Sequence, residues 1–167
     1  MPTPKQTAFD VDGSEAVSSV LVSLLNRFPG LGTRTIKFST LDDTAGLGFF
    51  PTSGAAILSN KEDITGHVHQ VCLYPFTVVY RAAAKTEAQR LKMKEFLDTL
   101  GKWLELQPVT IQGTEHKLSA YPSIGSGNRV IKSITRTNPA HLNAPYQDGV
   151  EDWTISATLR YENEFDK

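Results

Sequence analysis

The sequence has little of several features that would place it in a special class of protein. It contains a single cysteine, Cys72, so an internal disulfide and any zinc site built from cysteine pairs are excluded. No apolar run approaches the ~20 residues of a transmembrane helix, and residues 1–6 lack the apolar core of a signal peptide. We therefore expect a soluble protein made in a cytoplasm.

An excess of charge of one sign is also absent. The 17 Lys and Arg residues nearly balance the 18 Asp and Glu residues, which leaves a formal net charge of -1. This balance argues against a nucleic-acid protein held mainly by bulk positive charge. The chain does have 167 residues, of which 40% are hydrophobic, and this is enough to build one ordinary core. The sequence thus predicts a single domain over residues 1–167.

Two segments carry the apolar spacing of amphipathic helices. The first opens with Asp12 and Glu15, which have the spacing of a capping box, and its apolar stripe predicts a helix over residues 13–28. The second opens with a capping box at Thr86, and its stripe predicts a helix that ends near Leu106. Each apolar stripe requires a surface to pack against.

Alternating apolar and polar residues predict strands in the remaining parts of the chain. The segments are residues 35–39, 55–59, 66–82, 130–137 and 153–161, with a weaker one at 118–121. Near Pro75 the alternation changes phase, which predicts an edge position or a bulge there. The order α-β-β-β-α-β-β predicts an α+β fold, with two main helices packed on one face of an antiparallel or mixed β-sheet.

Three segments are expected to lie outside these elements: a flexible N-terminal lead at 1–11, a long loop or arm at 40–54, and a turn-rich loop at 138–149. The segment 40–54 is unusual because it is rich in glycine and still carries apolar side chains. It either folds back on the core or docks on a neighbouring subunit, where such side chains contribute most of the binding energy. The candidate interface residues are Leu41, Leu47, Phe49 and Phe50.

One short motif near the N-terminus suggests chemistry that its context does not support. Residues 9–14 resemble the aspartate loop of haloacid-dehalogenase-type phosphatases, with Asp10 as nucleophile and Asp12 as acid or base. That loop needs a buried strand before it and magnesium ligands after it, and the sequence offers neither. The same acids lack the spacing of a calcium loop. A helix cap is the better interpretation of this motif.

Histidine and cysteine give no stronger signal. His67 and His69 are two residues apart in a predicted strand, a geometry that some metal sites use, with His116, His141 or a carboxylate as a third ligand. Solvent-facing histidines are the favoured interpretation, and Cys72 is predicted to be a structural thiol. No catalytic, cofactor-binding or metal-ligating residue is assigned, so we expect a protein that is not an enzyme and holds no cofactor.

The order of the elements and a few short strings resemble one known family. The first helix ends in Phe-Pro-Gly at 28–30, the second ends in the string 96–105, and the last strand opens with Asp-Gly-Val-Glu-Asp-Trp-Thr-Ile at 148–155 and closes with Leu-Arg-Tyr at 159–161. Over residues 12–163 this pattern is similar to the minor capsid or tail-terminator proteins of long-tailed, non-contractile (siphovirus-type) bacteriophages and prophages of Gram-positive hosts.

The resemblance implies a structural virion protein of the tail or neck, assembled in the host cytoplasm. Members of that family are α+β domains that form a homo-oligomeric ring, typically a hexamer, on the end of the tail tube. The implied partners are further copies of the chain, the tail tube protein and a head-connector or stopper protein, with DNA only as cargo in the lumen and no membrane. The family brings no catalytic residues.

Two other functions stay open at the level of the sequence. One is a different component of the head–tail neck, such as a stopper. The other is a small ligand-binding or enzyme domain of the α+β class, with its pocket between the helices and the sheet.

Overall fold

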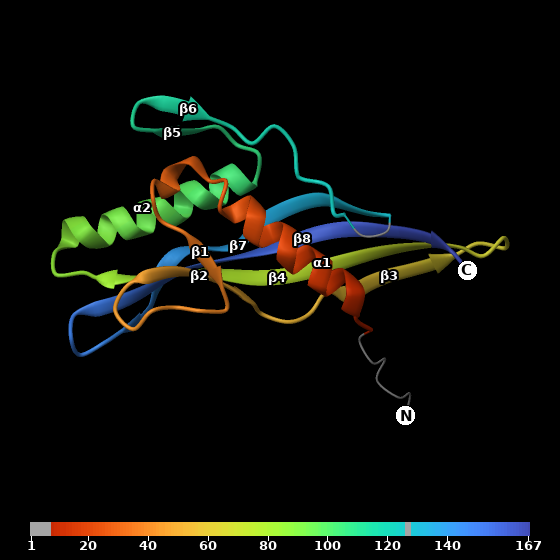
Figure 1. The fold of residues 1–167 in the computed structure, drawn as a ribbon, viewed down its shortest axis with the longest axis horizontal. Coiled ribbons are helices and arrows are strands. Elements are labelled where there is room, and N and C mark those ends of the chain that lie inside the picture. Colours follow the sequence, from red (N-terminus) through yellow and green to blue (C-terminus); the bar gives the residue numbers. More distant parts are fainter. Residues whose placement is uncertain (1–7, 126–127) are drawn as a thin grey trace.

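A mixed sheet carries both long helices on one of its faces (Figure 1). The computed structural model describes residues 8–125 and 128–167. The elements follow in the order α1 (Val11–Leu25), η1 (Pro29–Leu31), β1 (Ile36–Phe38), β2 (Gly46–Pro51), β3 (Ala56–Glu62), β4 (His67–Ala83), α2 (Glu87–Leu104), β5 (Val109–Ile111), β6 (Thr114–His116), β7 (Arg129–Pro145) and β8 (Val150–Asp166). The predicted α+β class, with its two helices on a mixed sheet, is confirmed.

Three long strands form most of the sheet, with β4 and β8 inside it and β7 at one edge. The strand order is β1-β2-β4-β8-β7, and β3 pairs with the part of β4 that β2 leaves free. Strands β4, β7 and β8 have 17 residues each, and β4 pairs with β8 without a break from His67↔Asp166 to Ala83↔Val150. At ~3.4 Å per residue such a pair is about 55 Å long. The β4–β8 register therefore places the His67–Asp166 pair and the Ala83–Val150 pair at opposite ends of the molecule.

The helices cover the face of the sheet that carries Tyr74 and Ile155. The hydroxyls of Ser18 in α1 and Tyr74 in β4 share a hydrogen bond of 2.6 Å, and Gly101 of α2 lies against Ile155 of β8. Tyr74, Phe76, Leu97, Leu100 and Leu159 are all fully or almost fully buried in this layer. On the opposite face no helix packs within residues 8–125 and 128–167 (Figure 1), and we call that side the bare face.

The helices begin close to where the sequence predicts, but the cap of α1 is a different residue. Asp10, not Asp12, accepts a hydrogen bond from the backbone N–H of Gly13 at 3.0 Å, so α1 starts at Val11. The helix ends at Leu25, three residues before the predicted end. The capping box of α2 at Thr86 and Gln89 is confirmed.

Two of the predicted loops are wrong, one in part and the other over most of its length. Residues 46–51 of the segment 40–54 form β2, because Leu47 and Phe49 turn into the core while β2 pairs with β4. The segment 138–149 belongs to β7 as far as Pro145, and only a short turn precedes β8. Pairing with β8 holds this stretch extended, and several register shifts accommodate the turn-forming residues.

Smaller differences have equally local causes. Residues 118–121 are not a strand, and the hairpin β5–β6 just before them was not predicted. Of the expected flexible lead 1–11, residues 1–7 lie outside the described residues. The prediction is wrong for the rest, because Phe9 forms an antiparallel bridge with Ala56 and the backbone N–H of Asp10 donates to Ala55.

The expectation for Pro75 is half right. The side-chain alternation keeps one phase, because Cys72, Tyr74, Phe76 and Val78 are all buried on the helix side. Pro75 does occupy an edge-like position, since the pairing of β3 stops opposite Leu73 and that of β2 stops opposite Phe76. A proline fits there because it has no N–H to donate to a neighbouring strand.

Candidate interface at the β1–β2 connection

The four candidate interface residues separate into two pairs. Leu47 and Phe49 are 3% and 0% exposed, and the ring of Phe49 packs on Phe76 with centroids 5.4 Å apart. They belong to the core of the chain itself, so the prediction that they contact a partner is corrected. Leu41 and Phe50 are half-buried and remain on the surface.

Leu41 and Phe50 pack together over the backbone of β2 on the bare face. A Cβ built on Gly48 would meet Phe50 Cε2 at 2.6 Å, the carbonyl oxygen of Thr40 at 2.9 Å and Leu41 Cγ at 3.1 Å. The connection between β1 and β2 therefore folds back tightly over Gly48, and a side chain there would push it away. The glycines of this segment serve close packing more than mobility.

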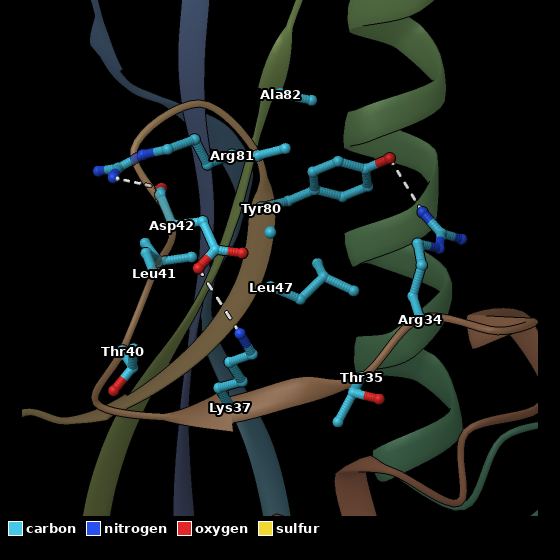
Figure 2. Close-up of a pocket in the computed structure, with 12 residues that line it drawn as sticks. Arg34, Thr35, Lys37, Thr40, Leu41, Asp42, Leu47, Tyr80, Arg81 and Ala82 are labelled. Carbon is cyan, nitrogen blue, oxygen red and sulfur yellow. Dashed lines mark hydrogen bonds and ion pairs between the residues drawn. The ribbon is translucent and has the colours of Figure 1, made fainter.

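A hollow of about 370 Å³ opens beside this connection (Figure 2). Its walls come from the segment after η1, from residues 40–47 and from the end of β4. They are lined by Arg34, Thr35, Lys37, Thr40, Leu41, Asp42, Ala45, Gly46, Leu47, Tyr80, Arg81 and Ala82. Three of these residues are cationic and Asp42 is the one carboxylate, so the hollow combines an apolar base with a basic rim. We call it the basic groove.

Arg34 is held in place on the rim of the basic groove without a carboxylate partner. Its guanidinium donates to the carbonyl oxygens of Leu31 and Gly30 at 3.1 Å each and to the Tyr80 hydroxyl at 2.9 Å. It also lies over the ring of Phe96, 4.5 Å from the centroid. Within residues 8–125 and 128–167 no Asp or Glu forms an ion pair with it. Three bonds use three of the five N–H donors of an arginine, so two remain for another acceptor.

Arg81 fixes the opposite wall through an ion pair. Its Nε and Nη2 donate to the two oxygens of Asp152 at 2.7 and 2.9 Å, and its Nη1 donates to the carbonyl oxygen of Asp42 at 3.1 Å. The Tyr146 hydroxyl donates to the same carboxylate at 2.8 Å. Burial alone would raise the pKa of Asp152, but the hydrogen bonds from Arg81 and Tyr146 outweigh it and hold that pKa below its ordinary value. The Asp152 carboxylate raises the pKa of Arg81 in return.

Lys37 and Asp42 form a weaker link across the mouth of the basic groove. Lys37 Nζ lies 3.6 Å from Asp42 Oδ1, and both side chains are more than half exposed. Exposed pairs of this kind contribute little free energy, so this link opens at low cost.

The motif at Asp10 is structural. Arg129 donates to both oxygens of Asp10 at 2.9 Å, and the hydroxyl of Tyr161 donates to Oδ2 at 2.6 Å. Burial works to raise the pKa of Asp10, but these bonds and the one from Gly13 lower it more, so the pKa lies below its ordinary value. A carboxylate engaged in this way ties α1 to β7 and β8.

The two histidines lie on the bare face at the far end of β4. His67 Nδ1 is 2.9 Å from Asp166 Oδ1, and this hydrogen bond raises the pKa of His67. His69 Nε2 lies 3.5 Å from Glu162 Oε2. Among the residues described, no group of three or more His, Cys, Asp or Glu side chains is arranged to hold a metal ion. His116 and His141 lie on β6 and β7 and do not join the pair.

Cys72 is fully buried, as expected of a structural thiol, and burial raises its pKa. None of the helices in the described part of the chain is both long and apolar enough to cross a bilayer.

Sequence reasoning missed Arg34, Tyr80 and Arg81, which shape the basic groove. Arg81 left one usable signal, because it is a charge within the otherwise uncharged alternation of residues 71–82. Arg34 left none, since an arginine after a turn is ordinary on any surface.

Comparisons with known proteins add one distant likeness. No protein-family profile matches the chain, and no curated protein matches it. Among solved structures the chain is similar to one in the "Virion of native gene transfer agent (GTA) particle", with a TM-score of 0.46 and 9% identity. The likeness covers 93% of this chain and 100% of that one. A similarity this low carries no argument about function.

Proposed function

We propose that the protein is a structural virion component without catalytic activity: a tail terminator that caps a phage tail tube as a homo-oligomeric ring and joins the tail to the head. The proposal starts from the resemblance of residues 12–163 to that family. The structural observation that best supports it is the long sheet with both helices on one face. The site of action would be the virion tail or neck.

The sheet has the properties of a wall element in a larger assembly. Strands β4 and β8 pair over their whole length of 17 residues, and both helices lie on one side of them. The middle of the bare face carries short hydroxylated side chains, and the hydroxyls of Thr77 and Ser156 share a hydrogen bond of 3.1 Å. Because the register of β4 against β8 is fixed over the whole pair, this part of the sheet keeps its shape when neighbouring subunits pack against it.

Tail tubes assembled from the tube protein provide the direct test. We expect the chain to bind tube ends and stop further growth, with rings of about six times 18.4 kDa visible in negative stain. Tube length with time, with and without the chain, is the measurement. Tubes that continue to grow at the same rate in excess chain would overturn the proposal.

A different neck component remains the closest alternative. It would form a similar ring but bind the head-connector side in place of the tube. Pull-down of the chain on immobilised tube protein and on the connector protein separates the two functions, because a terminator binds the tube protein.

A ligand-binding domain is the alternative from another class, and one observation favours it. The basic groove, at about 370 Å³, is as large as small-molecule sites often are. From the sequence, the pocket of such a domain is expected between the helices and the sheet. The basic groove lies elsewhere, because core side chains fill that space. Native mass spectrometry of the purified chain that finds a retained small molecule would support this function over the structural one.

A further inference from the structure

We infer that copies of the chain associate head to tail, with the basic groove of one copy receiving the acidic end of the next. The acidic end is defined here as the surface around Asp12, Glu164 and Phe165, where α1 begins and β8 finishes. The inference rests on the proposed self-assembly and specifies which two surfaces meet.

The basic groove offers an immobilised cation beside apolar surface. Arg34 lies between two hollows, because it and Tyr80 line both the basic groove and a second hollow of about 360 Å³ that also contains Phe96 and Lys92. Its backbone bonds and its contact with Phe96 fix the guanidinium before any partner arrives. A cation held in this way loses little conformational entropy on binding a carboxylate.

The acidic end offers the matching surface. A hollow there is lined by Asp12 and Glu164 together with Phe9, Val11 and Phe165. These three apolar side chains are 50%, 75% and 36% exposed. The Glu164 side chain lies on the bare face of this end, where it is 54% exposed, 3.9 Å from His69 Nε2, and helps to raise the pKa of His67. Asp12 is near enough to Arg129 to help raise the pKa of that guanidinium.

Acidic side chains outnumber basic ones around this end. Glu62, Asp63, Glu162, Glu164 and Asp166 stand against Lys61, Lys132 and Lys167, of which Lys132 and Lys167 pair with Glu162 and Glu62. The net charge of -1 for the whole chain therefore conceals an uneven distribution along the sheet. Complementary charges at opposite ends favour head-to-tail encounter over association of like ends.

One chain cannot make this contact with itself. Arg81, in the wall of the basic groove, pairs with Asp152, whereas His69 pairs with Glu164. The twelve positions of β8 between Asp152 and Glu164 span about 40 Å. Figure 1 shows the same separation, with the C-terminus at the opposite end of the sheet from the turn between β7 and β8. A contact between the two ends is therefore intermolecular and heterologous, the type that closes into a ring when the rotation permits.

Two edges of the sheet are poorly suited to strand addition between copies, and at the third, the outer edge of β3, Phe9 already bridges Ala56. Asn26 of α1 occupies the edge of β1, where its side chain accepts from the Ile36 N–H at 2.8 Å and donates to the Ile36 carbonyl at 2.9 Å. Strand β7 has four register shifts against β8 and contains Pro139 and Pro145. Irregularity and proline are common protections against edge pairing.

Charge reversal tests the pairing. We would measure the mass of the wild-type chain, R34E, E164R and the double variant R34E/E164R by light scattering over a range of concentrations. Each single variant is expected to weaken association at least tenfold, because it places like charges together. The double variant is expected to regain most of the loss, since each contact is again between opposite charges.

Mixing R34E with E164R tests the pairing of the two surfaces more specifically. R34E presents a negative groove and a negative end, and E164R presents a positive groove and a positive end, so they associate with each other and not with themselves. An equimolar mixture should assemble in strict alternation, and only rings with an even number of subunits can close.

Controls and contrary outcomes are defined by the same measurements. R27E and E115R make the same charge changes at exposed positions outside both surfaces and should assemble like wild type. Wild-type-like assembly of both R34E and E164R would overturn this inference and leave the proposed function standing. A wild-type chain that stays monomeric at every concentration would also overturn it, and the tube-growth experiment would then decide the proposed function separately.

Discussion

The structure builds the same polar arrangement twice, at opposite ends of the sheet and on opposite faces. In each, an aspartate is held by a bidentate arginine and a tyrosine hydroxyl: Asp10 with Arg129 and Tyr161, and Asp152 with Arg81 and Tyr146. We call these the Asp10 triad and the Asp152 triad. The first lies under α1 with Tyr161 fully buried, and the second borders the basic groove with Tyr146 45% exposed.

The two aspartates are similarly buried, at 9% and 5% exposed, so the triads differ in the exposure of their tyrosines and in the elements they join. The Asp10 triad joins the start of the first helix to the last two strands, so it closes the fold. Arg81 of the Asp152 triad also donates to the carbonyl oxygen of Asp42, so it sets the position of the β1–β2 connection. Chemically similar groups thus serve stability at one end and the shape of the candidate interface at the other.

Arg129→Ala is expected to have the largest effect on stability. It leaves the Asp10 carboxylate buried without its cation, and breaking a buried pair in this way costs about 3–5 kcal/mol. Urea unfolding followed by circular dichroism measures the loss. K132A, which alters an exposed pair on the same strand, is the control and should change stability by less than about 1 kcal/mol.

Arg81→Ala should cost somewhat less, about 3 kcal/mol, because Asp152 is as buried as Asp10 but its tyrosine partner, Tyr146, is 45% exposed and admits water. Its distinctive effect is local. Hydrogen exchange at residues 40–45 should become faster, because Asp42 loses its anchor, while exchange in α1 should not change. Equal acceleration in both regions would contradict the separation of roles between the two triads.

Removing one hydroxyl at a time sharpens the comparison. Tyr161→Phe deletes a hydrogen bond to a charged group in the buried triad and should cost about 1.5–3 kcal/mol. Tyr146→Phe makes the same deletion at the Asp152 triad, where water can take the place of the 45% exposed Tyr146 hydroxyl, and should cost less than about 1 kcal/mol. Thermal unfolding of the two variants gives the values, and a larger loss for Tyr146→Phe would invert the proposed order.

Acid should affect both triads together, through a gradual loss of stability. The pKa of each aspartate is lowered in the folded state, so each contributes stability that is fully present above the unfolded pKa and is lost as pH falls through the folded pKa. From pH 7 down to about 4 the two carboxylates should leave the free energy of unfolding unchanged. Below that, each adds a slope of at most about 1.4 kcal/mol per pH unit.

Asparagine variants check this assignment. Asp10→Asn and Asp152→Asn should each have a shallower acid limb than wild type in urea titrations at several pH values. A limb as steep as that of wild type in both variants would show that other carboxylates control the acid transition.

The long, regular parts of the fold were predictable because their signals are local. The apolar stripe of α1 and the capping box at Thr86 depend on neighbours within a few residues, and both gave elements close to the observed ones. The alternation of residues 153–161 likewise marks the middle of β8. The candidate interface was only partly predictable, because Leu41 and Phe50 stay on the surface whereas Leu47 and Phe49 do not.

The errors share one cause, which is competition from distant partners. Residues 46–51 and 138–145 look like loops by composition, and strand pairing holds them extended against that composition. Asp10 takes the cap from Asp12 because Arg129, 119 positions away, holds its carboxylate. No local pattern reports such a partner.

The sequence by itself determined the α+β class, the two helices and the central strands, since hydrophobic periodicity and capping act over one or two turns of chain. Only the folded structure shows that Arg34 has no carboxylate partner among residues 8–125 and 128–167. It also shows which aspartates meet which arginines and which end of the sheet is acidic. These depend on the register of β4 against β8, and that register brings together residues that the chain keeps far apart.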